Sequence, residues 1–205
     1  MDSHLILPAC YLPPIAYFSV ILQSQKPILL EQYEHYPKQT YRTRATIYSA
    51  NGKLDLIVPV QRGSMGHTQL KDVSISYEAD WQRLHWMSLQ TAYRSSAYFE
   101  YYEDDFADFY QRRYEKLLDY NTEQLKLILK LLKINREVGF TESYREDYAP
   151  GVDFRQSIHP KKALTGYTGK PYYQVFESKH GFFPNLSIVD LLFNQGPQSV
   201  DYLIA

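Results

Sequence analysis

The chain has 205 residues, of which 44% are hydrophobic and 22% are charged, and its formal net charge is -1. This length and this composition are typical of one soluble domain with a proper hydrophobic core. A net charge so close to zero argues against non-specific binding to nucleic acid or to a membrane surface, which needs a strong basic excess. The unusual feature is the 20 tyrosines. Such an excess favours polar pockets and interfaces, unless Tyr simply replaces Phe and Leu at half-buried positions.

Cysteine content and hydropathy bear on the compartment. Cys10 is the only cysteine, so no intramolecular disulfide framework is expected. No apolar run reaches the roughly 18 residues that a transmembrane helix needs, and no membrane insertion is expected. The start of the chain lacks a basic lead and contains three prolines, which argues against a signal peptide. We therefore expect a cytoplasmic protein.

The first elements predict a β-α-β unit. Residues 4–7 are short and apolar enough for a buried strand. Pro13 and Pro14 suit the start of a helix, which apolar residues at helical spacing continue to about Ser24. Residues 27–30 return as a second strand. The loop between the first strand and the helix lacks the glycine-rich phosphate-binding fingerprint.

A hairpin is expected next. Residues 43–48 and 54–60 flank Asn51-Gly52, a dipeptide that suits the positive φ angles of a tight hairpin turn.

A polar loop then separates the hairpin from another strand. The loop spans residues 62–69 and contains His67, which could approach a ligand. Residues 73–77 alternate in the manner of a strand.

The middle of the chain is helical. Asp80 is expected to cap a helix with one apolar face, and residues 98–118 form one long helix or two short ones. Asp119 or Asn121 caps a last helix. The acidic residues of this region favour a solvated helix face over a metal site, because adjacent side chains point in different directions. These residues are Glu103, Asp104, Asp105 and Asp108.

The last part of the chain is less regular. Residues 140–144 and 173–176 read as strands. Ser187 is expected to cap a helix over residues 188–194, and residues 197–204 can form one more short helix.

Together these elements predict a mixed α/β (α+β) fold. A small mixed sheet, with its β-α-β start and its hairpin, is covered by a helical segment. We expect a single domain over residues 1–205. It consists of an α/β part at residues 1–78, a helical part at 79–134, and a C-terminal part of strands, loops and short helices at 135–205.

One stretch, EQYEHYPKQTYRTR at residues 31–44, interleaves cationic side chains with tyrosines. Charge-assisted hydrogen bonds and aromatic faces suit an anionic ligand that carries a ring. The competing interpretation is a polar strand and turn with solvated charges. As substrate-binding residues of this stretch we predict Tyr36, Lys38, Tyr41, Arg42 and Arg44.

The topology suggests where this site lies. Ligands collect at the carboxyl ends of strands in a β-α-β unit, so we expect Tyr11, after the first strand, to line the same pocket. An arginine inside a strand needs a reason to be there, so Arg44 should face the pocket or have a bidentate carboxylate partner. His35 is the candidate general acid or base, because its reference pKa of about 6.5 suits proton transfer near neutrality.

A second basic group lies at residues 153–162, DFRQSIHPKK. Arg155 and Lys161 are predicted to bind a diphosphate or a carboxylate, and His159 is the second acid–base candidate. We expect this loop to close over the pocket as a lid that brings His159 near Lys38. The alternative is a mobile basic loop without a function.

Other catalytic chemistry is not indicated. No pair of histidines has a zinc-binding spacing, so no metal is expected, and no motif names a cofactor. GxSxG, P-loop and CxxC motifs are absent. Cys10 follows the first strand, where a nucleophile would be useful. A lone cysteine beside apolar residues is more often a packing residue, and we expect that role for it.

Several motifs, in order, resemble those of the WbqC-like proteins. The run Pro8-Ala9-Cys10-Tyr11-Leu12-Pro13 followed by Tyr17-Phe18 is similar to the opening of that family. The spacing Tyr36-x-Lys38-x-x-Tyr41-x-x-Arg44 resembles its ladder of aromatic and basic residues. The hairpin end, the Asp72-Val73 strand and the helix over residues 81–93 also fit, so the resemblance covers most of residues 5–134. The chain departs from the family pattern at Leu7, His35 and Tyr41.

The resemblance implies a bacterial enzyme of surface-polysaccharide (O-antigen-type) biosynthesis. Its small anionic substrate would be a nucleotide-linked sugar or the acyl or aminoacyl donor for that sugar, and its reaction a group transfer. The alternative is a non-catalytic binding or assembly protein with a tyrosine-rich interface. A homo-oligomer is left open by both interpretations.

Overall fold

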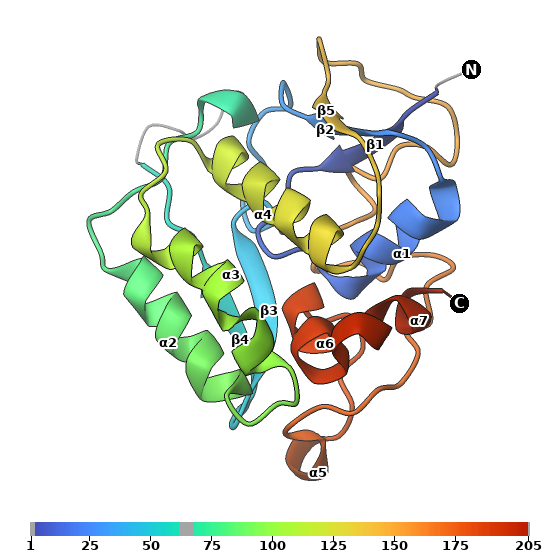
Figure 1. Ribbon diagram of the computed structural model, residues 1–205. Coiled ribbons are helices and arrows are strands. Elements are labelled where there is room, and N and C mark those ends of the chain that lie inside the picture. The colour runs from blue at the N-terminus through green and yellow to red at the C-terminus, as the bar shows by residue number, and fades with distance from the viewer. Residues whose placement is uncertain (1–2, 62–67, 205) are drawn as a thin grey trace.

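The chain combines a parallel sheet, an antiparallel hairpin and a set of helices, as the mixed α/β expectation requires (Figure 1). The computed structural model describes residues 3–61 and 68–204. His67 and most of the predicted polar loop therefore lie outside the described residues. None of the described helices is both long and apolar enough to cross a membrane.

The predicted β-α-β unit is confirmed. Strand β1 (Leu5–Pro8) leads through helix α1 (Ile15–Ser24) to strand β2 (Ile28–Glu31), which pairs parallel to β1. Strand β5 (Val138–Phe140) adds to the other side of β2, also parallel, and overlaps the strand expected at residues 140–144 at a single residue. The apolar side chains of β1, and Ile28 and Leu30 of β2, are buried because helices and loops cover both faces, whereas Val138 and Phe140 of β5 are partly exposed.

The predicted hairpin is also confirmed. Strands β3 (Arg44–Ser49) and β4 (Gly52–Ile57) pair antiparallel, with Ser49 opposite Gly52. The turn therefore lies at Ala50 and Asn51, one residue earlier than expected, and Gly52 alone of the expected turn pair has a positive φ, of 99°. Glycine adopts this left-handed conformation at no steric cost, which explains its place directly after the turn.

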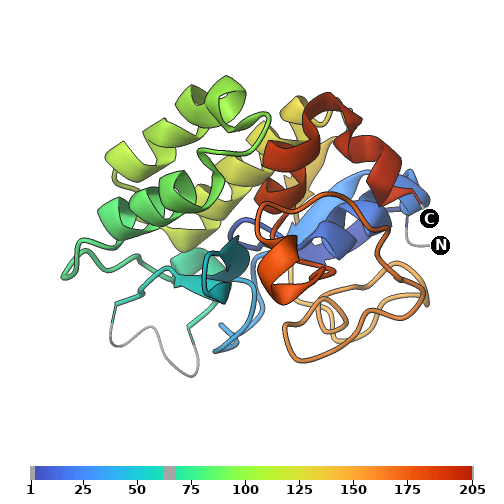
Figure 2. The same ribbon diagram turned by 90° about the horizontal axis from the view of Figure 1, so that it is seen from below.

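Three helices pack beside the hairpin. Helices α2 (Trp81–Tyr93) and α3 (Phe99–Gln111) lie side by side next to it, and α4 (Leu117–Leu131) runs between them and the parallel sheet (Figures 1 and 2). The segment expected to hold one or two helices thus holds α3 and the start of α4. Helix α4 begins before both of the caps expected for it.

Two predicted N-caps make other hydrogen bonds. The Asp80 carboxylate accepts a hydrogen bond from Arg83 Nε at 2.7 Å instead of from the backbone of α2. The Ser187 hydroxyl donates to the Leu12 carbonyl at 2.9 Å instead of capping helix α6 (Ile188–Gln195). Both helices form where expected, but the side chain of Asp80 bonds to a residue of its own helix and that of Ser187 to a residue distant in the chain.

Two predicted strands were wrong. Residues 73–77 follow the short 3-10 helix η1 (Leu70–Asp72) and make only isolated bridges, at Ser74 and Ile75. Residues 173–176 are irregular and lead into α5 (Glu177–His180). The backbone groups of these segments bond to loop residues or to side chains instead of to a neighbouring strand, so no ladder forms.

The chain ends in short helices. After α6 come the 3-10 helix η2 (Gly196–Ser199) and helix α7 (Val200–Leu203), where one last helix was expected. Figure 1 shows α6 and α7 below α1, and the Ser19 hydroxyl donates to the Leu203 carbonyl at 2.7 Å.

Most tyrosines belong to the core. More than half of the 20 are buried, and most of the buried hydroxyl groups have a hydrogen-bond partner inside the protein, although that of Tyr120 has none among the described residues. The buried ones are Tyr11, Tyr17, Tyr36, Tyr41, Tyr48, Tyr93, Tyr102, Tyr110, Tyr114, Tyr120 and Tyr172. For most of these residues, replacement of Phe and Leu is the correct interpretation of the tyrosine excess; Tyr41 also lines a cleft, described below.

Candidate functional site

The two basic segments recognised in the sequence lie side by side. Arg42 Nη2 donates a hydrogen bond to the Arg155 carbonyl at 3.1 Å. Lys161 Nζ donates to Gln39 Oε1 at 3.2 Å. These contacts join positions more than a hundred residues apart, so a candidate site can draw on both segments.

A cleft of about 510 Å³ opens where these segments meet the hairpin. One wall is the outer face of the hairpin, and the others come from residues 160–162 and 184–186. Its lining comprises Tyr41, Arg44, Thr46, Lys53, Leu54, Asp55, Pro160, Lys161, Lys162, Pro184, Asn185 and Leu186. We refer to it as the hairpin cleft.

Strand periodicity explains the polar wall. Side chains two residues apart on a strand share a face, so Arg44 and Thr46 on β3 face the same way. Thr46 pairs with Asp55 of β4, and Lys53 lies two residues before Asp55. All four side chains therefore line the outer face of the ladder, while Ala45, Ile47 and Leu56 are buried on the inner face.

The hairpin cleft is positively charged. Arg44, Lys53, Lys161 and Lys162 contribute four cationic groups, against the single carboxylate of Asp55. That carboxylate accepts a hydrogen bond from the Thr46 hydroxyl at 2.7 Å and lies 3.3 Å from Arg44 Nη1, so it anchors the guanidinium. The excess of cations suits a ligand with more than one negative charge, such as a diphosphate.

Tyr41 adds a neutral hydrogen-bonding group. Only 8% of its surface is exposed, and burial, followed by the nearby Cys10 and Asp55, raises its pKa to about 12. Its phenol therefore keeps its proton at neutral pH and can donate to a ligand oxygen.

His159 adjoins the hairpin cleft, just before its wall at Pro160. The Lys161 backbone N–H donates to His159 Nδ1 at 3.1 Å, so a neutral ring carries its proton on Nε2. Partial burial, with the charges of Lys162, Arg42 and Lys161, lowers the pKa of His159. At neutral pH the ring is therefore an uncharged donor through Nε2 and cannot act as a base at that atom.

Several predicted site residues have other roles. Arg42 is buried and binds the carboxylate of Glu34 through two hydrogen bonds, from Nε to Oε1 at 2.9 Å and from Nη2 to Oε2 at 2.8 Å. Its prediction as a phosphate ligand is contradicted by this geometry, because a fully paired guanidinium inside the core cannot reach a ligand in a surface cleft.

Arg155 is likewise structural. Its guanidinium bonds the carboxylates of Asp153 and Glu31, at 2.7 Å and 3.1 Å, and lies over the ring of Tyr148. It is 4% exposed, so it does not reach the hairpin cleft.

The start of the expected lid is part of the sheet. Val152 and Phe154 hydrogen-bond with the backbone of Ile6 in β1, at 2.8 Å and 3.0 Å, and Ile158 is buried. These bonds hold residues 152–154 along the free edge of β1. The expectation of a lid is therefore wrong for this part of the segment.

Tyr11 and Tyr36 also point inward. The Tyr11 hydroxyl lies 3.0 Å from both His85 Nδ1 and the Tyr110 hydroxyl, in the core. The Tyr36 hydroxyl lies 3.2 Å from the Thr43 hydroxyl. The loop of Tyr11 does meet the segment of Tyr41, through a backbone hydrogen bond of 2.8 Å, but its side chain does not line the shared cleft.

The remaining predicted residues divide into two groups. Tyr41, Arg44 and Lys161 come together in the hairpin cleft. His35 and Lys38 are exposed and are not among the residues that line it; His35 forms an isolated bridge with Gln69.

Most of the other lining residues were missed in the sequence, Lys53 and Asp55 among them. Lys53 directly precedes the strand expected over residues 54–60 and Asp55 lies within it; both are exposed, on the face opposite the buried Leu56. Aligning them with Arg44 across the predicted turn would have found the polar wall.

The other chemical candidates are absent from the described part of the chain. Cys10 is buried, and burial raises the pKa of its thiol to about 12, so it is a packing residue and not a nucleophile. Within residues 3–61 and 68–204, no group of three or more His, Cys, Asp or Glu side chains could hold a metal ion.

Comparisons with known proteins agree with the resemblance. The chain is 25% identical over 228 residues to the uncharacterized protein Rv1507c of Mycobacterium tuberculosis, and the alignment covers 99% of this chain and 98% of that protein. No solved structure matches the chain. The sequence model of the WbqC-like protein family matches residues 9–177, most of the chain and all but the last part of the hairpin cleft. The chain therefore belongs to the WbqC-like protein family.

Proposed function

We propose that the protein is an enzyme of surface-polysaccharide biosynthesis that binds a nucleotide-linked sugar, or the acyl or aminoacyl donor for that sugar, in the hairpin cleft. The reaction is the transfer of a group involving the activated sugar. The observation that carries this proposal is the convergence of Arg44, Lys53, Lys161 and Lys162 on one cleft. The pathway is the one that the resemblance to the WbqC-like proteins implies.

The cations suit the phosphate part of such a substrate. Arg44 presents a planar fork that the Asp55 carboxylate keeps in position, while lysines are flexible point charges that adapt to a second phosphate group. A volume of about 510 Å³ is within the range of small-molecule sites. Pro160 and Pro184 add apolar surface against which a sugar or base ring can pack.

His159 and Tyr41 are the candidates for a role in the reaction. Both are neutral donors at the physiological pH, the first through Nε2 and the second through its hydroxyl. Donors of this kind stabilise negative charge that develops on an oxygen during acyl or phosphoryl transfer. The proposed role of His159 is therefore to donate a hydrogen bond, and not to accept a proton.

The alternative, an assembly protein with a tyrosine-rich interface, draws no support from the tyrosines. Among them Tyr101, Tyr144 and Tyr173 are prominently exposed, and they lie on α3, on the loop after β5 and before α5. Such scattered residues do not favour one interface over a binding cleft.

A ligand screen tests the proposal. Nucleotide sugars, free nucleotides, acyl-CoA and amino acids are screened by thermal shift, since a ligand at a hundred times its Kd stabilises a protein by about 2.7 kcal/mol. The expected result is stabilisation by a phosphorylated compound that is lost in a Lys161→Gln/Lys162→Gln variant. An Arg83→Gln/Arg94→Gln variant, which removes two exposed charges from α2, is the matched control. Equal binding by the two variants would contradict the proposal.

A further inference from the structure

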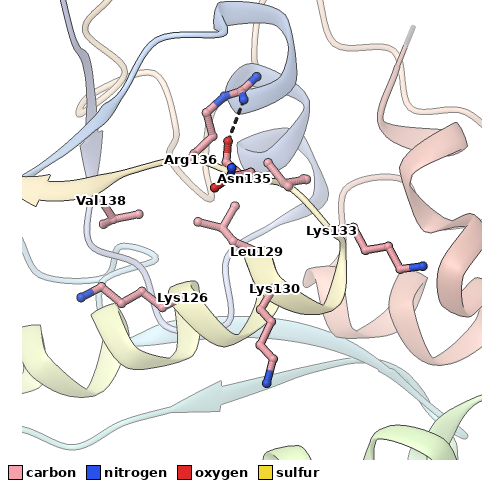
Figure 3. Close-up of a pocket in the computed structure, with 8 residues that line it drawn as sticks. Lys126, Leu129, Lys130, Lys133, Asn135, Arg136 and Val138 are labelled. Atoms are coloured by element: carbon pink, nitrogen blue, oxygen red, sulfur yellow. Dashed lines mark hydrogen bonds between the residues drawn. The ribbon is translucent and has the colours of Figure 1, made fainter.

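A second cleft, of about 470 Å³, lies between the end of α4 and the segment that leads into β5 (Figure 3). It is separate from the hairpin cleft, with which it shares no lining residue. Its lining comprises Lys126, Leu129, Lys130, Lys133, Ile134, Asn135, Arg136 and Val138. We refer to it as the α4 cleft.

The floor of the α4 cleft is apolar. Leu129 and Ile134 are nearly buried, and Val138 is half-buried at the start of β5. The Ile134 backbone N–H donates to the Leu129 carbonyl at 2.9 Å, which brings the chain back over the end of the helix. The floor is thus an extension of the core, in which Val138 and the edges of Leu129 and Ile134 are the apolar surface that a ligand can contact.

The rim of the α4 cleft is cationic. Lys126 and Lys130 are four residues apart and share one side of α4, and Lys133 follows two residues after the helix ends. Figure 3 shows these side chains and Arg136 around Leu129 and Val138. Among the described residues that line the cleft, none is acidic. Four cations around one cleft are notable in a chain whose net charge is -1.

Arg136 contributes a donor without an acceptor. Its Nη1 donates to the Asn135 carbonyl at 2.8 Å, as the dashed line in Figure 3 marks, but its Nε is buried and has no hydrogen-bond partner among the described residues. A buried donor without a partner is costly, and a bound anion would relieve that cost.

Lys133 occupies a position that favours glycine. Its φ is 55°, the left-handed conformation that commonly follows a helix and that a residue with a Cβ adopts at a cost. Cations near a helix C-terminus are ordinarily explained by the helix dipole. That explanation accounts for Lys130. At residue 133, however, glycine would adopt the left-handed backbone conformation at a lower cost than lysine does. The lysine therefore indicates a use for its charge.

We propose that the α4 cleft binds an amphiphilic anion, a molecule with an aliphatic chain and a phosphate or carboxylate head. The chain would cover Leu129, Ile134 and Val138, and the head would be held by the cationic rim. A simple inorganic anion leaves the apolar floor exposed, and a neutral lipid leaves the mutual repulsion of the four cations in place. Only a ligand with an aliphatic chain and an anionic head can cover the apolar floor and also neutralise the cationic rim. This inference does not rest on the function proposed above.

Alkyl phosphates of increasing length, each below its micelle-forming concentration, test the proposal by titration calorimetry. Each methylene that the floor buries should tighten binding roughly fourfold, so octyl phosphate should bind roughly a hundredfold or more tighter than butyl phosphate. Inorganic phosphate should bind weakest. An affinity that does not depend on chain length would overturn the proposal.

Variants test the rim. Lys130→Gln should weaken octyl phosphate binding roughly fivefold. Lys133→Gly should weaken it by a similar factor while the Tm stays the same or rises, because glycine relieves the backbone; this separates a binding effect from misfolding. The Arg83→Gln/Arg94→Gln variant should bind as the wild type does. Unchanged affinity in both lysine variants would overturn the role of the rim.

A vesicle measurement separates a single bound molecule from a membrane surface. Phosphatidylcholine vesicles with and without phosphatidylglycerol are tested for co-sedimentation with the protein. Binding of octyl phosphate as a monomer supports the proposal whatever the vesicles show. Binding to phosphatidylglycerol vesicles without any binding of monomeric octyl phosphate would overturn it, and would assign the cleft to membrane docking.

Discussion

Arg42 and Glu34 form a buried ion pair with two parallel hydrogen bonds, of 2.9 Å and 2.8 Å. Burial raises the pKa of the Glu34 carboxyl above its ordinary value, although the charge and hydrogen bonds of Arg42 oppose this shift. Asn121 of α4 also donates to the Arg42 carbonyl, at 2.7 Å. The pair thus stands where the basic segment, the sheet and α4 meet, and it ties them together.

Removing one partner of this pair should destabilise the fold strongly. Arg42→Met leaves the Glu34 carboxylate buried without a countercharge, and the expected loss is about 3–5 kcal/mol in the free energy of unfolding. The double variant Arg42→Met/Glu34→Leu should recover much of that loss. Urea unfolding followed by circular dichroism measures both. An Arg42→Met variant of wild-type stability that no longer binds phosphorylated ligands would instead make Arg42 a ligand residue.

Arg44 should contribute to ligand binding where Arg42 does not. Arg44→Lys keeps the charge but loses the planar fork, so the affinity for the phosphorylated compound found in the screen should fall by about tenfold. Stability should change little, because the guanidinium is partly exposed and its pair with Asp55 is at the surface. Titration calorimetry gives the affinity, with Arg94→Lys as the control. Equal affinities for the two variants would remove Arg44 from the site.

His159 should report on an anion in the hairpin cleft. The pKa of its imidazole is lowered in the free protein, by partial burial and then by neighbouring cations. A bound phosphate adds negative charge nearby and should raise this pKa towards and beyond its ordinary value. Titration of the imidazole proton signals by NMR, with and without ligand, measures the shift. His4, at the far end of β1, serves as the internal control, and a shift shared by both histidines would mean a non-specific effect.

His85 makes the stability pH-dependent. Burial lowers its pKa to about 4, although a hydrogen bond with the Ile57 carbonyl opposes the shift. The unfolded chain therefore binds a proton at about pH 6.5, while the folded chain binds it only near pH 4. Stability supplied by the neutral ring is lost as the pH falls from 6.5 to 4, by up to about 3 kcal/mol.

A His85→Gln variant should lack this pH-dependent loss. The comparison must be a difference between the two proteins, because Asp190 titrates in the opposite sense: burial raises its pKa to about 6, so its contribution to stability grows as the pH falls below 6. Since Asp190 is present in both proteins, its contribution cancels. Urea unfolding at several pH values gives the difference, and parallel profiles for the two proteins would contradict the assignment to His85.

Limited proteolysis should show that the two ends of the second basic segment, residues 153–162, differ in their susceptibility to cleavage. Trypsin is expected to cleave after the exposed Lys161 and Lys162 but not after Arg155, whose side chain and neighbouring backbone are bonded to the sheet. A ligand in the hairpin cleft should slow cleavage at the two lysines, while cleavage after the exposed Lys133 proceeds unchanged. Protection at all these sites would mean global stabilisation instead of local contact.

Local patterns were sufficient for much of the fold. The apolar residues of β1 and β2, and the helical spacing between them, predict the β-α-β unit because strand and helix periodicities act over a few residues. The dipeptide Asn51-Gly52 predicts the hairpin for the same reason. The strands expected at residues 73–77 and 173–176 failed, since an alternating segment becomes a strand only if another strand pairs with it.

Only part of the candidate site could be predicted from the sequence. The basic and aromatic residues predicted a site at residues 31–44 and 153–162, and these two segments do contact each other. The partners of each cation decide whether it faces solvent. Arg42 is paired with a carboxylate eight residues away, and Arg155 with one 124 residues away. Arg44 and Lys161, in contrast, line the cleft.

What the sequence determined by itself was the order of local elements and the family, because periodicity, turn chemistry and motif spacing are properties of short stretches. The tertiary structure alone decided which charges are buried in pairs and which surround a cleft. The physical reason is desolvation: a guanidinium can enter the core only if a carboxylate from elsewhere in the chain meets it there. That encounter depends on how distant segments pack, and the residue types near each arginine do not reveal it.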